Sequence, residues 1–138
     1  MLPTKLGIIE GSRVALVGAP DGFERELEPL PAGVRMLKQP RSNLDVVVFF
    51  VTRRAELTRR FPRLAAVLHC DGGLWVAWPK RTACVATDLS ERDVRSVGLS
   101  GGLVDNKVCA VDDVWSGLRF VYRLSDRPNG QRREASAH

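Results

Sequence analysis

The sequence is poor in the residues that form disulfides or bind metals. It contains 3 cysteines and 2 histidines among 138 residues. Cys70, Cys84 and Cys109 are odd in number and far apart, so their spacing forms neither a disulfide framework nor a CxxC metal knuckle. His69 precedes Cys70, but no third ligand is evident beside this pair. We therefore expect free thiols in a reducing compartment and no bound metal.

Long hydrophobic runs are also missing. The longest uninterrupted apolar run extends only from Val46 to Val51, whereas a membrane-spanning helix needs roughly 20 apolar residues. Residues 1–12 lack the apolar stretch of a signal peptide. These two absences predict a cytoplasmic protein with no membrane span.

The composition is that of an ordinary globular protein. Hydrophobic residues make up 44% of the chain and charged residues 27%, which excludes disordered and fibrous classes. The length suits one hydrophobic core. We expect one folded domain over residues 1–125, followed by a polar, disordered tail over residues 126–138.

The positive charge is spread along the chain. Lys plus Arg minus Asp plus Glu is 21 − 16 = +5, which would suit a polyanion only if the basic residues were clustered. The densest basic group is Arg53, Arg54, Arg59, Arg60 and Arg63. These arginines do not form one helical stripe and have a glutamate among them, so a solvated face is the preferred interpretation. Weak nucleic-acid binding through these arginines, together with Arg127, Arg132 and Arg133 of the tail, is a lesser alternative.

The pattern of apolar residues predicts strands alternating with helices. The expected strands are 13–18, 34–38, 44–51, 74–78, 103–111 and 115–124. The expected helices begin at Asp21, at Arg53 and at Ser90, and run to about residues 30, 69 and 98.

Several residues indicate how these helices begin and end. Asp21 with Glu24, and Ser90 with Asp93, have the spacing of capping boxes. Gly98 is placed to end the third helix in the left-handed conformation. Pro62 has no backbone N–H to donate to the preceding helical turn, so we expect the helix to kink or restart there.

This alternation predicts a single Rossmann-like α/β domain, a three-layer sandwich around a mainly parallel sheet. The predicted strand order is 2-1-3-4-6-5, with the last two strands forming an antiparallel hairpin. Only residues 39–43 link the second strand to the third, and five extended residues reach roughly 17 Å. An antiparallel second strand is therefore an alternative.

Two segments resemble the middle of class I S-adenosylmethionine-dependent methyltransferases. These segments are Leu44–Val48 and Leu64–Val76, which are similar to the F-D-V-V strand and the L-K-P-G-G turn of that family. The closing hairpin also looks like the last two strands of the family. This resemblance implies a reduced form of the methyltransferase fold.

Further segments resemble a family of short bacterial proteins that is designated only as a domain of unknown function. The resemblance spans residues 5–124 and is carried by Lys5–Gly7, Val17–Phe23, Trp75–Lys80, Thr87–Leu89 and Gly102–Trp115. It implies the fold and no activity.

The first turn departs from the methyltransferase pattern, in which a tight glycine turn lets the backbone approach the cofactor. Here the turn is Gly18–Gly22, which lacks G-x-G, and Pro20 removes an amide donor. Lys38 and Gln39 stand where the pattern has a ribose-binding carboxylate. We therefore expect no cofactor, with S-adenosylmethionine as the less favoured possibility.

Topology predicts where a ligand would bind. In open α/β sheets ligands lie beyond the carboxyl ends of the strands, here between the first and third strands. The loops at that edge carry basic, aromatic and acidic side chains suited to a polar or anionic ligand. The candidates are Asp21, Gly22, Arg53, Trp78, Lys80, Arg81, Asp112, Asp113 and Trp115. Alternatively, Trp78 is core, Lys80 and Arg81 form a solvated loop, and Asp112 and Asp113 form the turn.

No catalytic constellation accompanies these residues, since neither G-x-S-x-G nor a P-loop occurs. We therefore predict a non-catalytic or regulatory module that binds a partner or a small ligand. The alternative is a divergent small-molecule methyltransferase that uses Asp112 or Asp113 as base. A sheet edge or the hairpin could mediate a homodimer, and the monomer is the other alternative.

Overall fold

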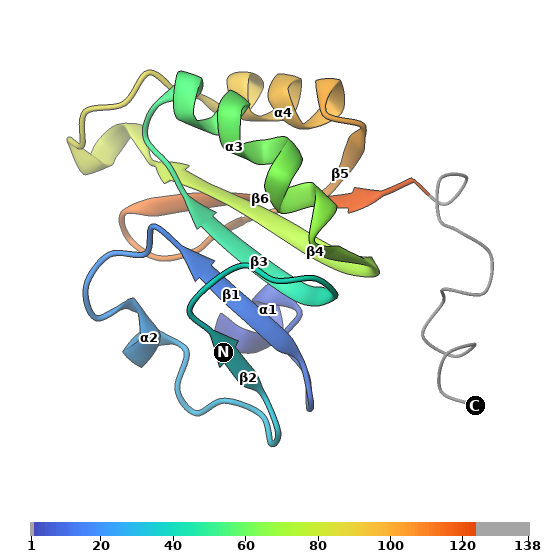
Figure 1. Cartoon of the computed structure of the whole chain (residues 1–138). Coiled ribbons are helices and arrows are strands. Elements are labelled where there is room, and N and C mark those ends of the chain that lie inside the picture. Colours follow the sequence, from blue (N-terminus) through green and yellow to red (C-terminus); the bar gives the residue numbers. More distant parts are fainter. Residues whose placement is uncertain (1, 124–138) are drawn as a thin grey trace.

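The computed structural model describes residues 2–123, which form one six-stranded sheet between two layers of helices (Figure 1). The strand order is β2-β1-β3-β4-β6-β5. The strands are β1 (Arg13–Val17), β2 (Arg35–Leu37), β3 (Leu44–Phe50), β4 (Leu68–Pro79), β5 (Leu103–Ala110) and β6 (Trp115–Tyr122). Strands β1 to β4 are parallel, and β6 is antiparallel to both β4 and β5. The predicted Rossmann-like fold and strand order are confirmed.

The second strand is parallel to the first, so the antiparallel alternative is wrong. Arg13 pairs with Arg35 and Ala15 with Leu37. Strand β2 has only 3 residues. Because it is so short, the link after it can pass β1 and still reach the start of β3.

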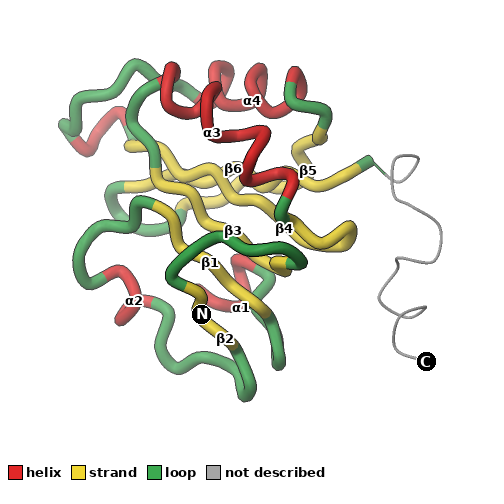
Figure 2. The backbone as a smooth tube through the Cα atoms, viewed as in Figure 1, coloured by secondary structure: helices red, strands yellow, loops and turns green. Residues whose placement is uncertain are grey.

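The helices lie on opposite faces of the sheet (Figure 2). One face is covered by α3 (Arg54–Ala66) and α4 (Glu91–Ser100), and the other by the short helices α1 (Leu2–Leu6) and α2 (Phe23–Glu26). A single 3-10 turn, η1 (Arg81–Ala83), follows β4. None of the helices in residues 2–123 is both long and apolar enough to span a bilayer.

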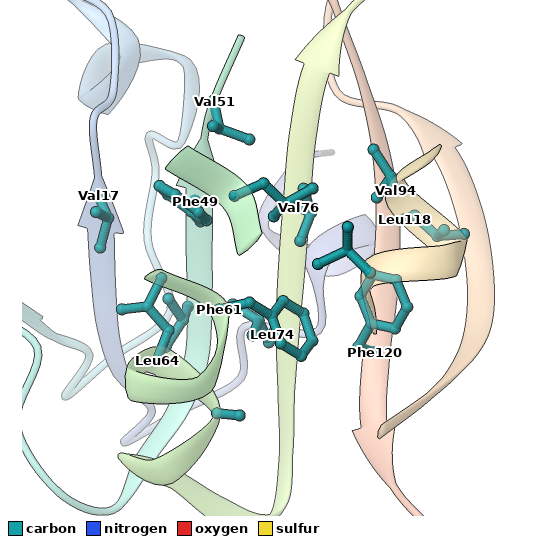
Figure 3. Packing of buried hydrophobic residues seen from close by; sticks show 14 of the residues in the cluster. Val17, Phe49, Val51, Phe61, Leu64, Leu74, Val76, Val94, Leu118 and Phe120 are labelled. Carbon is teal, nitrogen blue, oxygen red and sulfur yellow. The ribbon is translucent and has the colours of Figure 1, made fainter. Parts of the chain in front are cut away.

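Strand β3 is buried on both faces, as its apolar run predicts. Val47 and Phe49 belong to the cluster under α3 and α4, in which Figure 3 shows Phe49. Val46 and Val48 alternate with them and pack under α1 and α2. Each such side chain stabilises the fold by about 1.5–3 kcal/mol relative to exposure. The centre of the sheet is therefore a rigid platform for the loops at its edges.

Helix α2 is shorter than predicted and is not capped by Asp21. It spans only 4 residues, and its N-cap is Gly22 with φ 84 and no side-chain hydrogen bond. The left-handed Gly22 turns the chain into the helix directly, so Asp21 is exposed outside it. The prediction that this helix continues towards residue 30 is also wrong.

Helix α4 begins as predicted but ends later. Ser90 and Asp93 form a complete capping box. The helix continues through Gly98 to Ser100, and a left-handed residue appears only at Gly102, with φ +92. Gly98 is therefore a packing residue, because a Cβ there would lie 2.0 Å from the Phe120 ring.

The connection from α3 to β4 also differs from the prediction. Helix α3 runs through Pro62 without a restart and ends at Ala66. Strand β4 begins at Leu68, so Gly72 and Gly73 lie inside the strand rather than before it. The expected tail over residues 126–138, and Leu124 at the end of the last predicted strand, lie outside the described residues.

Candidate functional site

The order of the strands reverses between β1 and β3, because the chain leaves β1 towards β2 and returns on the other side. The loops after β1, β3 and β4 and the β5–β6 turn all leave the sheet at one edge, which we call the carboxyl edge. Ligands of open α/β folds bind at such a reversal. The predicted site residues other than Trp78 belong to these loops, to η1 or to the first residue of β6.

Gly18 makes the turn after β1 tight. Its φ is +70, and a Cβ at this position would lie 2.8 Å from the carbonyl oxygen of Phe50. Both the conformation and the space therefore require glycine. The backbone after β1 passes directly against the end of β3, and Gly22 then reverses it into α2.

Three aromatic side chains connect this turn to the hairpin. Phe23 of α2 packs edge-on against Phe50 with ring centroids 4.7 Å apart. Phe50 in turn packs edge-on against Trp115, at 5.1 Å. Trp115 is half-buried and lies beside the cluster under α1 and α2. These rings therefore hold α2, β3 and β6 together beneath the loops of the carboxyl edge.

The hairpin turn is shaped by Asp112. Its Oδ1 accepts hydrogen bonds from the amides of Val114, at 2.8 Å, and Trp115, at 2.9 Å. The Lys80 amide donates to the Val114 carbonyl at 2.8 Å, which ties the loop after β4 to this turn. The structure thus brings Lys80, Asp112 and Trp115 together, and it gives Asp112 the turn-forming role of the alternative interpretation.

Glu26 is a further candidate site residue, which the sequence did not indicate. Its carboxyl group, on α2, lies near enough to Asp112 and Asp113 of the hairpin turn for their charges to act on it. Partial burial raises the pKa of Glu26 above its ordinary value, and the neighbouring Asp112 side chain and the charge of Asp113 raise it further. The residue as a whole is exposed, so the carboxyl group remains accessible. No local sequence pattern connects Glu26 with a turn so distant in the chain.

Asp88 is a second residue that was missed. Its Oδ1 accepts a hydrogen bond from the Arg54 amide at 2.7 Å. Arg53, the N-cap of α3, makes no side-chain capping bond, so the cap of α3 comes from the loop before α4. The Thr87 hydroxyl donates to the Thr52 carbonyl at 2.7 Å and holds the same two loops together. The spacing of the Thr87–Leu89 segment gives no sign of this contact.

The other predicted residues are more dispersed. Trp78 is 6% exposed and packs in the cluster under α3 and α4, so it is core, on the face away from Trp115. Arg53, Arg81 and Asp21 are exposed in the three separate loops of the edge. Asp113 is exposed and acts on Glu26 by its charge.

Cavities also lie elsewhere on the described part of the molecule. The first, of about 220 Å³, lies between α3 and α4, with Thr58 and Val97 in its wall. The second, of about 110 Å³, includes Ser12 and Asp45. The third, of about 250 Å³, is lined mainly by the arginines of α3. None of these three cavities is lined by a predicted site residue.

Sequence comparisons leave the chain without a match, since no family model and no curated protein matches it. Solved structures do match. A putative type 11 methyltransferase from Sulfolobus solfataricus has a TM-score of 0.64 at 13% identity, covering 95% of both chains. A SAM-dependent methyltransferase from Aquifex aeolicus has a TM-score of 0.62 at 16% identity, covering 85% of both chains.

A third solved structure contains a cofactor. The magnesium protoporphyrin IX methyltransferase from Synechocystis PCC 6803, solved with bound SAM, has a TM-score of 0.57 at 12% identity. The match covers 88% of this chain and 74% of that one. At identities this low, the matches establish similarity of the fold alone. The chain therefore has the fold of the class I S-adenosylmethionine-dependent methyltransferases, as the sequence resemblance implies.

Proposed function

We propose that this protein binds S-adenosylmethionine at the carboxyl edge of its sheet and is a divergent methyltransferase for a small molecule. The observation that carries the proposal is the turn at Gly18, where glycine alone fits between β1 and the Phe50 carbonyl. This turn lies where the strand order reverses, and a structurally similar methyltransferase has been solved with bound SAM. The proposal replaces the expectation of no cofactor and prefers the methyltransferase alternative to the non-catalytic module.

The residues at the edge fit an adenosyl ligand in part. The turn over residues 18–22 would hold it through main-chain groups, since Gly18 and Gly22 carry no side chain there. Pro20 donates no amide, so fewer main-chain donors face the ligand than in a G-x-G turn. Once bound, S-adenosylmethionine supplies an electrophilic methyl group for transfer.

The proton acceptor in this proposal is Glu26 rather than Asp112. Asp112 Oδ1 is committed to two backbone amides of the turn. Glu26 is exposed, and its pKa is raised by partial burial and by its acidic neighbours. A carboxylate with a raised pKa accepts a substrate proton more readily near neutral pH. Lys80 and Arg81 supply positive charge for a polar or anionic substrate.

The test is calorimetric titration with S-adenosylmethionine and S-adenosylhomocysteine, supported by thermal unfolding. Ligand at 100 times its dissociation constant should stabilise the protein by about 2.7 kcal/mol. Gly22→Ala should weaken binding. Gly102→Ala is the matched control, because both glycines have positive φ and open space for a Cβ. Equal binding by both variants would contradict a site at this turn.

A second candidate function has its own supporting observation. The packed rings of Phe23, Phe50 and Trp115 join α2 to the hairpin across the edge, and Pro20 removes a donor. These features favour a non-catalytic module that binds a different ligand or a partner. If neither S-adenosylmethionine nor its product binds a well-folded protein, this second candidate replaces the first.

A further inference from the structure

We infer that His69, Cys70 and Asp71 form a binding site for a divalent metal of the zinc class. The three residues follow Leu68 at the amino end of β4. This is the opposite end of the parallel strands from the carboxyl edge, so the inference is independent of the proposed function. The sequence predicts no metal site, because no third ligand is evident beside His69 and Cys70, but the structure brings Asp71 to this pair.

The donor atoms already lie close together. One ligand atom from each residue, an imidazole nitrogen, a thiol sulfur and a carboxylate oxygen, lies within 4.8 Å of the others. The Cys70 Sγ is 3.9 Å from the His69 Nδ1. Around a tetrahedral zinc ion, sulfur and nitrogen ligands lie about 3.6 Å apart. Small side-chain adjustments would therefore close the three atoms around one ion.

An irregularity in the sheet explains why three consecutive residues can converge. Leu44 pairs with Leu68 and Val46 pairs with Gly73, so the four residues 69–72 of β4 lie opposite the single residue Asp45 of β3. In a regular strand, consecutive side chains point to opposite faces, and such a bulge breaks that alternation.

Gly72 holds this irregular segment against β3. A Cβ on Gly72 would lie 2.7 Å from the Leu44 carbonyl oxygen and 2.9 Å from that of Asp45. The backbone of β4 therefore approaches β3 as closely as only glycine permits. The position of the preceding residues is a consequence of this close backbone contact.

The donor set suits zinc better than harder cations. A thiolate, an imidazole and a carboxylate are the ligand types of zinc sites, and three protein ligands leave the fourth position for water. The lone pair of His69 Nδ1 accepts the Asp71 amide hydrogen at 3.1 Å, and this same nitrogen lies near the Cys70 Sγ. The metal would take this lone pair in place of the amide. The Cys70 thiol would lose its proton to solvent as the sulfur–metal bond forms.

The test is titration of the reduced protein, without a polyhistidine tag, with Co²⁺ alone and then with Zn²⁺ as competitor. We expect a thiolate-to-cobalt charge-transfer band in the near ultraviolet, which zinc removes. Calorimetry of zinc binding in two buffers of different ionisation enthalpy should detect the released proton. Absence of a charge-transfer band would overturn the inference.

Variants identify which thiol binds. Cys70→Ser should abolish the band, whereas Cys84→Ser, which alters an exposed thiol, should leave it unchanged. Because Cys70 is buried, circular dichroism must show that its variant is folded. His69→Gln changes a half-buried residue and provides a second test, with the band shifted and the affinity for cobalt reduced. A band that persists in Cys70→Ser but disappears in Cys84→Ser would contradict the site.

Discussion

The ring of Phe120 fills the space in which a side chain on Gly98 would begin. A Cβ on Gly98 would be 2.0 Å from Cε1 of that ring. Phe120 is fully buried and packs edge-on against Phe61, with ring centroids 5.4 Å apart. Helix α4 can therefore approach β6 only because Gly98 lacks a side chain, and Phe61 of α3 completes the contact.

This contact predicts that Gly98→Ala is destabilising, although alanine is the better helix former by about 1 kcal/mol. Overpacking of a buried site costs about 1–3 kcal/mol, so urea unfolding should show a net loss of stability. Phe120→Leu in the same chain should reduce the effect of Gly98→Ala. Additive losses in the double variant would mean that the two residues do not compete for space.

A second prediction concerns the cap of α3. Asp88→Ala removes the acceptor for the Arg54 amide and should cost about 0.5–2 kcal/mol of unfolding free energy. Asp21→Ala is the control, because Asp21 is exposed and does not cap α2. Its effect should stay within about 0.5 kcal/mol. Equal losses in the two variants would exclude a capping role for Asp88.

A third prediction concerns the attachment of α1. The indole Nε1 of Trp75 donates to the Leu6 carbonyl at 2.9 Å in a buried setting. Trp75→Phe removes this bond, and an unsatisfied buried carbonyl costs about 1–3 kcal/mol. Trp78→Phe makes the same substitution in the cluster on the other face of the sheet, and it should reduce the unfolding free energy by less. Hydrogen exchange of the α1 amides should accelerate in the first variant only.

The fourth prediction is a pH dependence of stability. The pKa of Glu26 is raised from 4.5 in the folded protein by partial burial, by Asp112 and by the charge of Asp113. The folded state therefore holds this proton more tightly than the unfolded state does. The stability that protonated Glu26 contributes is fully present below pH 4.5. It is lost as the pH rises through the pKa of Glu26 in the folded state.

Glu26→Gln should remove this part of the pH profile of unfolding free energy. Glu24→Gln, on the same short helix, is the matched control and should keep the profile. A profile that is unchanged in Glu26→Gln would show that another group titrates in this range.

The order of the strands could be predicted from the sequence because it follows from local patterns. The apolar run over Leu44–Phe50 is typical of a strand covered on both faces, and the short links leave few routes between strands. The Ser90 and Asp93 capping box could also be predicted, since both partners lie within one helical turn.

Contacts between distant segments were decided by the tertiary structure. Glu26 meets Asp112 only because α2 and the hairpin share the carboxyl edge. A glycine near the end of a helix can either terminate the helix or allow close packing. Only the position of the Phe120 ring shows that Gly98 does the second. The grouping of His69, Cys70 and Asp71 depends on the irregular pairing of β4 with β3. Periodicity and helix capping depend on residues that are only a few positions apart in the sequence. These contacts depend instead on how closely separate backbone segments can pack.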